Sequence, residues 1–218
     1  AAHPARARLM TDAETLKVYA ERAGDYARLF DAKEPDADLG AFIAELPAGA
    51  RVLDLGCSIG QCTTALKQRF PDAEVCGLDV GLPLLRYAHK RATDLGIDVH
   101  FQQGLAEDSR LPSGQYDVIL AYILFHEVPE RLFSQILAEV HRLLRPGGRF
   151  TVIDAPNNRN LPAANRLWLK FDALYNCEPY SPAFVASDFR QLMTDAGLRV
   201  THAGPTPTFL HCTTAVKD

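Results

Sequence analysis

The amino-acid sequence predicts a doubly wound α/β fold, in which a mostly parallel sheet carries helices on both faces. Between Arg51 and Asp154, short apolar runs typical of buried strands alternate with longer segments whose apolar residues recur at helical spacing. Connections are short, and each return to a parallel strand needs a crossover that a helix supplies. With 218 residues, 47% of them hydrophobic, the chain can bury one sizeable core and is too short for two full-sized domains.

Helices are expected before the sheet. Thr11 and Glu14 form a capping-box pattern, and apolar side chains then recur at helical spacing up to the break near Pro35. A second short helix ends at Pro47, because proline and the glycine that follows it turn the chain. Residues 11–47 are therefore predicted to form an N-terminal helical cap.

The first strand is predicted at the apolar run Arg51 to Leu55. Later strands are predicted over 74–79, 99–103, 116–121 and 149–154, with helices near 61–70, 82–95 and 130–144. Residues 155–186 then break the alternation, because they are rich in Asn, Pro and aromatic residues. A helix near 187–196 follows, and two apolar runs, 198–203 and 208–216, predict a terminal hairpin.

These elements predict a single domain over residues 11–218, with 155–186 as a lid insertion after the fifth strand. Residues 1–10 hold no apolar stretch like that of a secretory signal. We interpret them as a leader or an expression remnant, with Met10 as a candidate start.

Composition narrows the classes of partner and location. A formal charge of −4 provides no broad attraction to nucleic acid or anionic lipid, so nucleic acid is disfavoured as a partner. No apolar run is long enough to cross a bilayer. The five cysteines form no Cys-x-x-Cys pair, which is typical of reduced cytosolic thiols. We expect a cytoplasmic protein with a small-molecule partner, no membrane contact and no metal site.

Glycines and acidic residues gather at predicted strand ends. The run VLDLGCSIGQ, residues 52–61, passes from a buried strand through a turn with Gly56 and Gly60 into a helix. An ordinary strand-to-helix turn explains the two glycines alone. However, Asp54 ends the first strand and Asp79 ends the second, where carboxylates can accept hydrogen bonds from an ammonium group and from ribose hydroxyls. Because open α/β sheets bind ligands at the carboxyl ends of strands, we expect a nucleotide-like ligand there.

Here the chain resembles class I S-adenosylmethionine-dependent methyltransferases of the small-molecule type, which include the methyltransferase domains 11 and 25. The resemblance covers roughly residues 51–154. Besides the first turn, its motifs are Gly77-Leu-Asp-Val80, Ala106-Glu-Asp108, Tyr116-Asp-Val-Ile119 and Leu143-Leu-Arg-Pro-Gly-Gly148. It implies a Rossmann-like, doubly wound seven-stranded sheet whose last strand runs antiparallel. It also implies methyl transfer from S-adenosyl-L-methionine to a small organic acceptor, with S-adenosyl-L-homocysteine as product.

The resemblance implies a set of cofactor-binding residues. Asp79 would bind the ribose, Val80 would pack on the adenine, and Ala106 and Glu107 would border it. The methionine part would be held by the first turn and its neighbours: Tyr26, Asp54, Gly56, Cys57, Ser58, Gly60, Gln61 and Tyr122. Two positions depart from the family pattern, since Leu105 stands where aspartate is frequent and Ser58 where glycine is common.

Catalytic candidates follow the fourth strand. His126 titrates near neutrality, Glu127 can accept a proton, and Tyr122 lies where the family commonly touches the cofactor. A base matters chiefly when the acceptor is a hydroxyl or another weakly acidic group. Two interpretations stay open: His126 also fits an "LHH" element that has no established proton-transfer role in some members, and Glu127 could simply begin the next helix.

Aromatic side chains are predicted to form a substrate lid. From the N-terminal helix, Tyr19 and Tyr26 share one apolar face. The insertion adds Trp168, Phe171, Tyr175, Tyr180 and Phe184 as walls for an apolar or ring-bearing acceptor. Core packing explains most of these residues equally well.

Two alternative functions are kept. A nicotinamide-dependent oxidoreductase also uses a glycine turn and an acid after the second strand, but its middle glycine is replaced here by Ser58. A catalytically inactive subunit that binds adenosylmethionine would keep the same cofactor residues without turnover.

Overall fold

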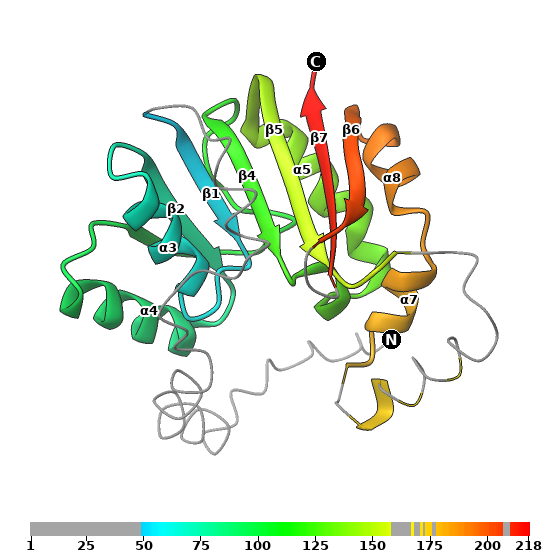
Figure 1. The fold of residues 1–218 in the computed structure, drawn as a ribbon, viewed down its shortest axis with the longest axis horizontal. Helices are drawn as coiled ribbons and strands as arrows, with labels where there is room; N and C mark the ends of the chain where they lie inside the picture. Colours follow the sequence, from blue (N-terminus) through cyan, green and yellow to red (C-terminus); the bar gives the residue numbers. More distant parts are fainter. Residues whose placement is uncertain (1–48, 158–166, 168–170, 172, 176–177, 207–209) are drawn as a thin grey trace, which may run out of the picture.

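Seven strands form one twisted sheet in the order β3-β2-β1-β4-β5-β7-β6 (Figure 1). The computed structural model describes residues 49–157, 167, 171, 173–175, 178–206 and 210–218. The strands are β1 Arg51–Leu55, β2 Glu74–Asp79, β3 His100–Gln103, β4 Tyr116–Tyr122, β5 Leu144–Asp154, β6 Leu198–Pro205 and β7 His211–Lys217. Strands β1 to β5 pair in parallel, whereas β7 runs antiparallel to both of its neighbours. The predicted doubly wound sheet and its C-terminal antiparallel hairpin are confirmed.

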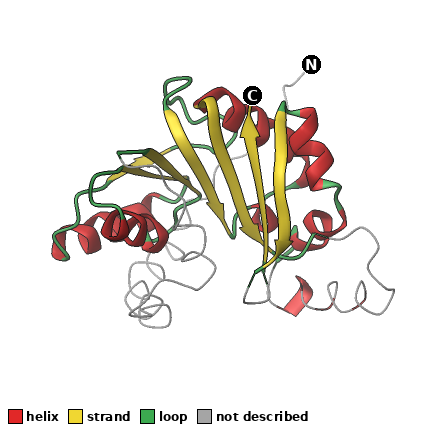
Figure 2. Ribbon diagram, turned by 45° about the horizontal axis from the view of Figure 1, so that its top comes forward, coloured by secondary structure: helices red, strands yellow, loops and turns green. Residues whose placement is uncertain are grey.

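Helices cover both faces of this sheet (Figure 2). Helices α3 Gln61–Arg69 and α4 Leu82–Asp94 lie on one face. Helices α5 Phe133–Leu143, α7 Ser181–Ala186 and α8 Phe189–Asp195 lie on the other, together with the short 3-10 helices η1 Phe125–Glu127 and η2 Glu130–Leu132. Among the described helices, none combines the length and the apolar content that a bilayer crossing requires.

The central strand β1 belongs to both faces. Its Val52 packs in the core cluster under α3 and α4, while Leu53 and Leu55 pack in the cluster under α5, α7 and α8. Successive side chains of a strand point to opposite faces, so a strand buried on both faces reads as a continuous apolar run. The only polar side chain in β1 after Arg51 is Asp54 near its carboxyl end, which is also buried.

An aromatic cluster joins the loop after β4 to α5, α7 and α8. Phe125 is fully buried, and its ring centroid lies 4.5 Å from that of Phe189 and 5.7 Å from that of Phe133. Phe184 lies in the same cluster with 2% of its surface exposed. Although the sequence groups Phe184 with the lid residues, the structure buries it in the core, because α7 directs its apolar side toward Phe125.

Several predicted boundaries shift. Strand β5 begins at Leu144 rather than Arg149, since Leu144 already pairs with Tyr116 before a register irregularity. The single helix predicted over 130–144 divides into η2 and α5. The predicted cap over 11–47, with Tyr19 and Tyr26, lies outside the described residues, as do Trp168 and much of the lid insertion.

The core position of Phe184 yields a direct prediction. Phe184→Ala should lower the free energy of unfolding by about 3–5 kcal/mol, because it leaves a cavity among packed rings. Tyr175→Ala serves as the control: Tyr175 is 72% exposed, so its loss should cost less than about 0.5 kcal/mol. Urea unfolding of both variants measures the difference, and equal costs would contradict the assignment of Phe184 to the core.

Candidate functional site

The turn between β1 and α3 requires its glycines. Gly56 and Gly60 have φ angles of +79° and +74°, in the left-handed region that favours glycine. A Cβ on Gly60 would lie 2.6 Å from a ring carbon of Phe101, so no larger residue fits without displacing that ring. Gly60 is the N-cap residue of α3, so no side chain caps the helix, and the first turn of the helix holds no acidic residue. The turn therefore presents a helix N-terminus to the carboxyl edge of the sheet.

Asp54 is a buried carboxyl group beside this turn. It is 1% exposed, and its Oδ2 accepts a hydrogen bond of 2.6 Å from the Thr63 hydroxyl. Burial raises the pKa of Asp54 to about 6, and the hydrogen bond from Thr63 opposes that rise while the charge of Asp79 adds to it. A cationic group bound nearby would favour the ionised form and offset the cost of burial.

Asp79 connects two loops at the same edge. Its Oδ2 accepts the backbone N–H of Ser58 at 2.8 Å, and its Oδ1 accepts that of Gly81 at 2.7 Å. The side chain is half-buried, so its carboxylate still borders solvent. Ser58, which stands where glycine is common in this motif, has a φ of 49° and so adopts a strained backbone conformation. The hydrogen bond to Asp79 holds it there.

Exposed apolar side chains surround Asp79. Val80 is 63% exposed, Leu105 is 46% exposed and Leu82 is 40% exposed. The backbone brings these side chains to one edge, since the N–H of Gly104 donates to the Asp79 carbonyl at 3.0 Å. A carboxylate flanked by open apolar surface fits a ribose with an attached aromatic base, and Leu105 offers apolar contact where an aspartate would offer a hydrogen bond.

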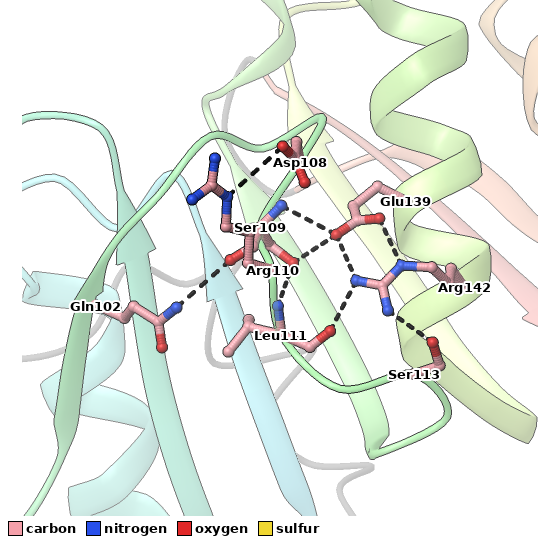
Figure 3. Close-up of polar contacts among 8 residues, drawn as sticks. All are labelled: Gln102, Asp108, Ser109, Arg110, Leu111, Ser113, Glu139 and Arg142. Carbon is pink, nitrogen blue, oxygen red and sulfur yellow. Dashed lines mark hydrogen bonds and ion pairs between the residues drawn. The ribbon is translucent and has the colours of Figure 1, made fainter.

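The loop after β3 is held against α5 by a polar network (Figure 3). One carboxylate oxygen of Glu139 accepts both the backbone N–H and the hydroxyl of Ser109. Arg142 binds both oxygens of Glu139 at 2.7 Å and also donates to the Leu111 carbonyl at 2.8 Å. This network positions the preceding half-buried residues Ala106 and Glu107, which the sequence assigns to the cofactor site.

His126 is buried at the carboxyl edge, beyond the strained end of β4. Ile123 has a φ of +56°, an unfavourable conformation for a β-branched residue. His126 is 7% exposed, and its Nδ1 lies 2.6 Å from Oδ1 of Asp154 at the end of β5. Its Nε2 lies 3.5 Å from Oε1 of the exposed Glu127. Glu178 is the third member of this group, because ligand atoms of the three residues lie within 4.8 Å of one another.

Sequence reasoning did not find Asp154 or Glu178. No motif signals a pair that joins residues 28 positions apart, as His126 and Asp154 do. Of the predicted lid aromatics, Phe171 and Tyr175 stack with ring centroids 4.1 Å apart, and Tyr180 is 38% exposed. The predicted Tyr122 ends β4 and is half-buried.

Comparisons with known proteins identify the domain. Residues 52–148 match the family model of a methyltransferase domain. Residues 52–148 therefore form a methyltransferase domain of the class I S-adenosylmethionine-dependent type. This family implies S-adenosylmethionine as cofactor, which the open helix N-terminus, the buried acid and the apolar-flanked carboxylate fit. It also removes the nicotinamide-dependent oxidoreductase from consideration.

Individual relatives match only part of the chain. It is 34% identical over 109 residues to the demethylmenaquinone methyltransferase of Thermus thermophilus, covering 50% of this chain and 49% of that protein. It is 36% identical over 143 residues to the trans-aconitate 2-methyltransferase of Deinococcus radiodurans, covering 65% and 51%. The chain thus spans about half the length of these curated relatives.

A solved structure shares the fold. An S-adenosylmethionine-dependent methyltransferase from Aquifex aeolicus superposes with a TM-score of 0.65 at 22% identity, covering 83% of this chain and 90% of that one.

Glu139 should stabilise the fold in a pH-dependent way. The hydrogen bond from Arg142, helped by Ser109 against the opposing effect of burial, lowers the pKa of Glu139. Its contribution is therefore complete above the unfolded value of about 4.3 and is lost as pH falls through the lower folded pKa. Glu139→Gln should cost about 1–3 kcal/mol of unfolding free energy at pH 7.

Urea unfolding at several pH values checks this prediction. The difference between the wild type and Glu139→Gln should shrink as pH falls below about 4. Glu130→Gln, at an exposed position on η2, is the control and should differ little from wild type at any pH. A difference that stays constant with pH would show that the charge of Glu139 contributes nothing.

Proposed function

We propose that this chain transfers the methyl group of S-adenosyl-L-methionine to a small organic acceptor by in-line displacement. The proposal rests on the positions of Asp54 and Asp79. They lie near the carboxyl ends of the adjacent strands β1 and β2, beside the turn that contains Gly56 and Gly60. The strand order reverses between β1 and β4, and ligands of doubly wound sheets bind at this switch point. The relatives whose names specify a methylated compound, including trans-aconitate, support a small acceptor.

The cofactor, when bound, supplies an electrophilic methyl group on a positively charged sulfur. Asp54 and the backbone N–H groups at the start of α3 would bind the methionine part, with Cys57, Ser58 and Gln61 forming the rest of the turn. The carboxylate of Asp79 would accept hydrogen bonds from the ribose hydroxyls, while Val80 and Leu105 cover the adenine. Ala106 and Glu107 would close the edge of the adenine pocket.

The loop after β4 would complete the acceptor side. Leu124 lies against the glycine turn, since a Cβ on Gly56 would be 2.7 Å from its side chain. This closeness supports a position of Tyr122, His126 and Glu127 beside the proposed cofactor site, where they would contact the reacting groups. Holding the nucleophile in line and excluding water can supply about 7–11 kcal/mol of barrier reduction. We also propose that the predicted lid aromatics bind the acceptor. Three of them, Tyr19, Tyr26 and Trp168, lie outside the described residues.

Calorimetric titration with S-adenosylhomocysteine tests the cofactor site. Asp79→Asn should weaken binding by about tenfold to a hundredfold, because the charge that accepts the ribose hydroxyls is lost. Asparagine keeps one oxygen acceptor for the loop N–H groups, which makes it a milder change than alanine.

Asp98→Asn is the matched control, since Asp98 is an exposed acid before the amino end of β3. It should leave the affinity unchanged, and thermal melts should show both variants folded. Equal affinities of wild type and Asp79→Asn would remove Asp79 from the cofactor site. Tight binding without methylation of any acceptor in a broad panel would instead favour an inactive binding subunit.

A further inference from the structure

Asp154 organises the loop that carries His126. The backbone N–H of Ile123 donates to the Ile153 carbonyl at 2.8 Å, and that of Phe125 donates to Oδ2 of Asp154 at 2.8 Å. The Phe125 side chain is fully buried in the aromatic cluster. The strained turn at Ile123 is thus compensated by contacts with β5 and the core, which fix the position of His126.

The same carboxylate determines which nitrogen of His126 carries a hydrogen. Asp154 is 1% exposed, and its Oδ1 accepts the N–H of Ala155 as well as facing His126 Nδ1. A carboxylate only accepts hydrogen bonds, so the neutral imidazole must carry its hydrogen on Nδ1. The lone pair of Nε2 is then on the side of the ring away from Asp154, where Oε1 of Glu127 lies 3.5 Å from Nε2.

The surroundings of Nε2 select the charge of a bound group. A ring nitrogen of His126, a Glu127 oxygen and a Glu178 oxygen lie within 4.8 Å of one another, and Nε2 is the nitrogen that lies 3.5 Å from Glu127. Nε2 and both carboxylates bear lone pairs when His126 is neutral. A further anion would meet repulsion from both glutamates, whereas a group that donates a hydrogen would be attracted. A carboxylic acid is moreover already ionised at neutral pH and needs no base, unlike a phenol or an ammonium group.

We infer that His126 and Asp154 form a base dyad, with Asp154 as its positioning residue, and that the methyl acceptor is a protic hydroxyl or ammonium group rather than a carboxylate. The inference rests on the proposed methyl transfer. The proton of the acceptor moves to His126 Nε2, and the freed electron pair forms the bond to the methyl carbon. The carbon–sulfur bond breaks with its electrons remaining on sulfur. A carboxylate acceptor, such as the name of the trans-aconitate relative suggests for that protein, is thereby disfavoured for this chain.

The electrostatics of the pair fit this role. Burial alone lowers the pKa of His126, but the hydrogen bond and charge of Asp154, with Glu127 and Glu178, outweigh burial and raise it. Arg190 and His211 line a small pocket together with Asp154 and are further titratable groups near the pair. A stronger base at Nε2 follows from the negative partner at Nδ1.

The first test is nitrogen-15 NMR of the histidine rings in the whole protein with bound S-adenosylhomocysteine. Above the pKa of His126, the wild type should show a neutral ring with its hydrogen on Nδ1, and in Asp154→Asn the ring should titrate at a lower pH. This measurement on the unmodified protein keeps the inference testable even if the variant folds poorly. Hydrogen on Nε2 in the wild type would overturn the dyad.

The second test compares phenols, amines and carboxylic acids as acceptors. For a hydroxyl or amine acceptor, kcat/KM should rise with pH through the pKa of His126. Asp154→Asn should shift that inflection to lower pH and lower kcat by about a hundredfold or more. Its affinity for S-adenosylhomocysteine should stay within twofold of wild type. Asp188→Asn, at an exposed helix cap, is the control and should keep wild-type kcat.

Two outcomes would overturn the inference while leaving the proposed function intact. One is carboxylic acid methylation that is indifferent to His126→Gln. The other combines two results: turnover requires an added divalent cation, and Mn²⁺ broadens the NMR signal of His126. Together they would make Nε2 a metal ligand with Glu127 and Glu178. If the wild-type protein does not bind S-adenosylhomocysteine, the proposed function itself is wrong.

Discussion

The burial of β1 in the centre of the sheet determines where its neighbouring strands and their loops lie. This strand is buried on both faces and pairs with β2 on one edge and β4 on the other. Because the chain leaves β1 toward β2 and later returns to its other side as β4, the strand order reverses between β1 and β4, where doubly wound sheets bind their ligands. Asp54, Asp79 and the loop bearing His126 all lie at the carboxyl edge of the sheet because β1, β2 and β4 are parallel and end there.

The two faces of the sheet supply different groups to this edge. Asp54 contacts Thr63 of α3 on one face. Asp154 shares its face with Val152 and the aromatic cluster under α7 and α8. Each buried acid is compensated by hydrogen bonds, and within the described part of the chain no buried side-chain nitrogen or oxygen lacks a partner. The proposed cofactor site and the proposed dyad are therefore stabilised by different hydrogen bonds.

The sequence predicts the centre of the sheet well because the central strands β1 and β4 are largely buried on both faces. Continuous apolar runs locate β1 and β2 to the residue, and the terminal hairpin follows from two apolar runs around a proline-containing turn. The early start of β5 is set by its pairing with β4, which has no local signature. Phe184 shows the same limit, because composition cannot distinguish an aromatic lid residue from a core residue. The cofactor residues are predicted through motifs, whereas Asp154 depends on a contact between two strand ends.

Hydrogen exchange of the backbone amides, with and without S-adenosylhomocysteine, would locate the cofactor site. We expect added protection in three places that are distant in sequence: the turn at 56–62, the loop at 79–81 and the loop at 104–107. Amides at the opposite edge of the sheet, such as those near Asp98, should exchange at unchanged rates. Protection elsewhere on the folded protein, or no change at saturating ligand, would contradict a cofactor site at the carboxyl ends of β1, β2 and β3.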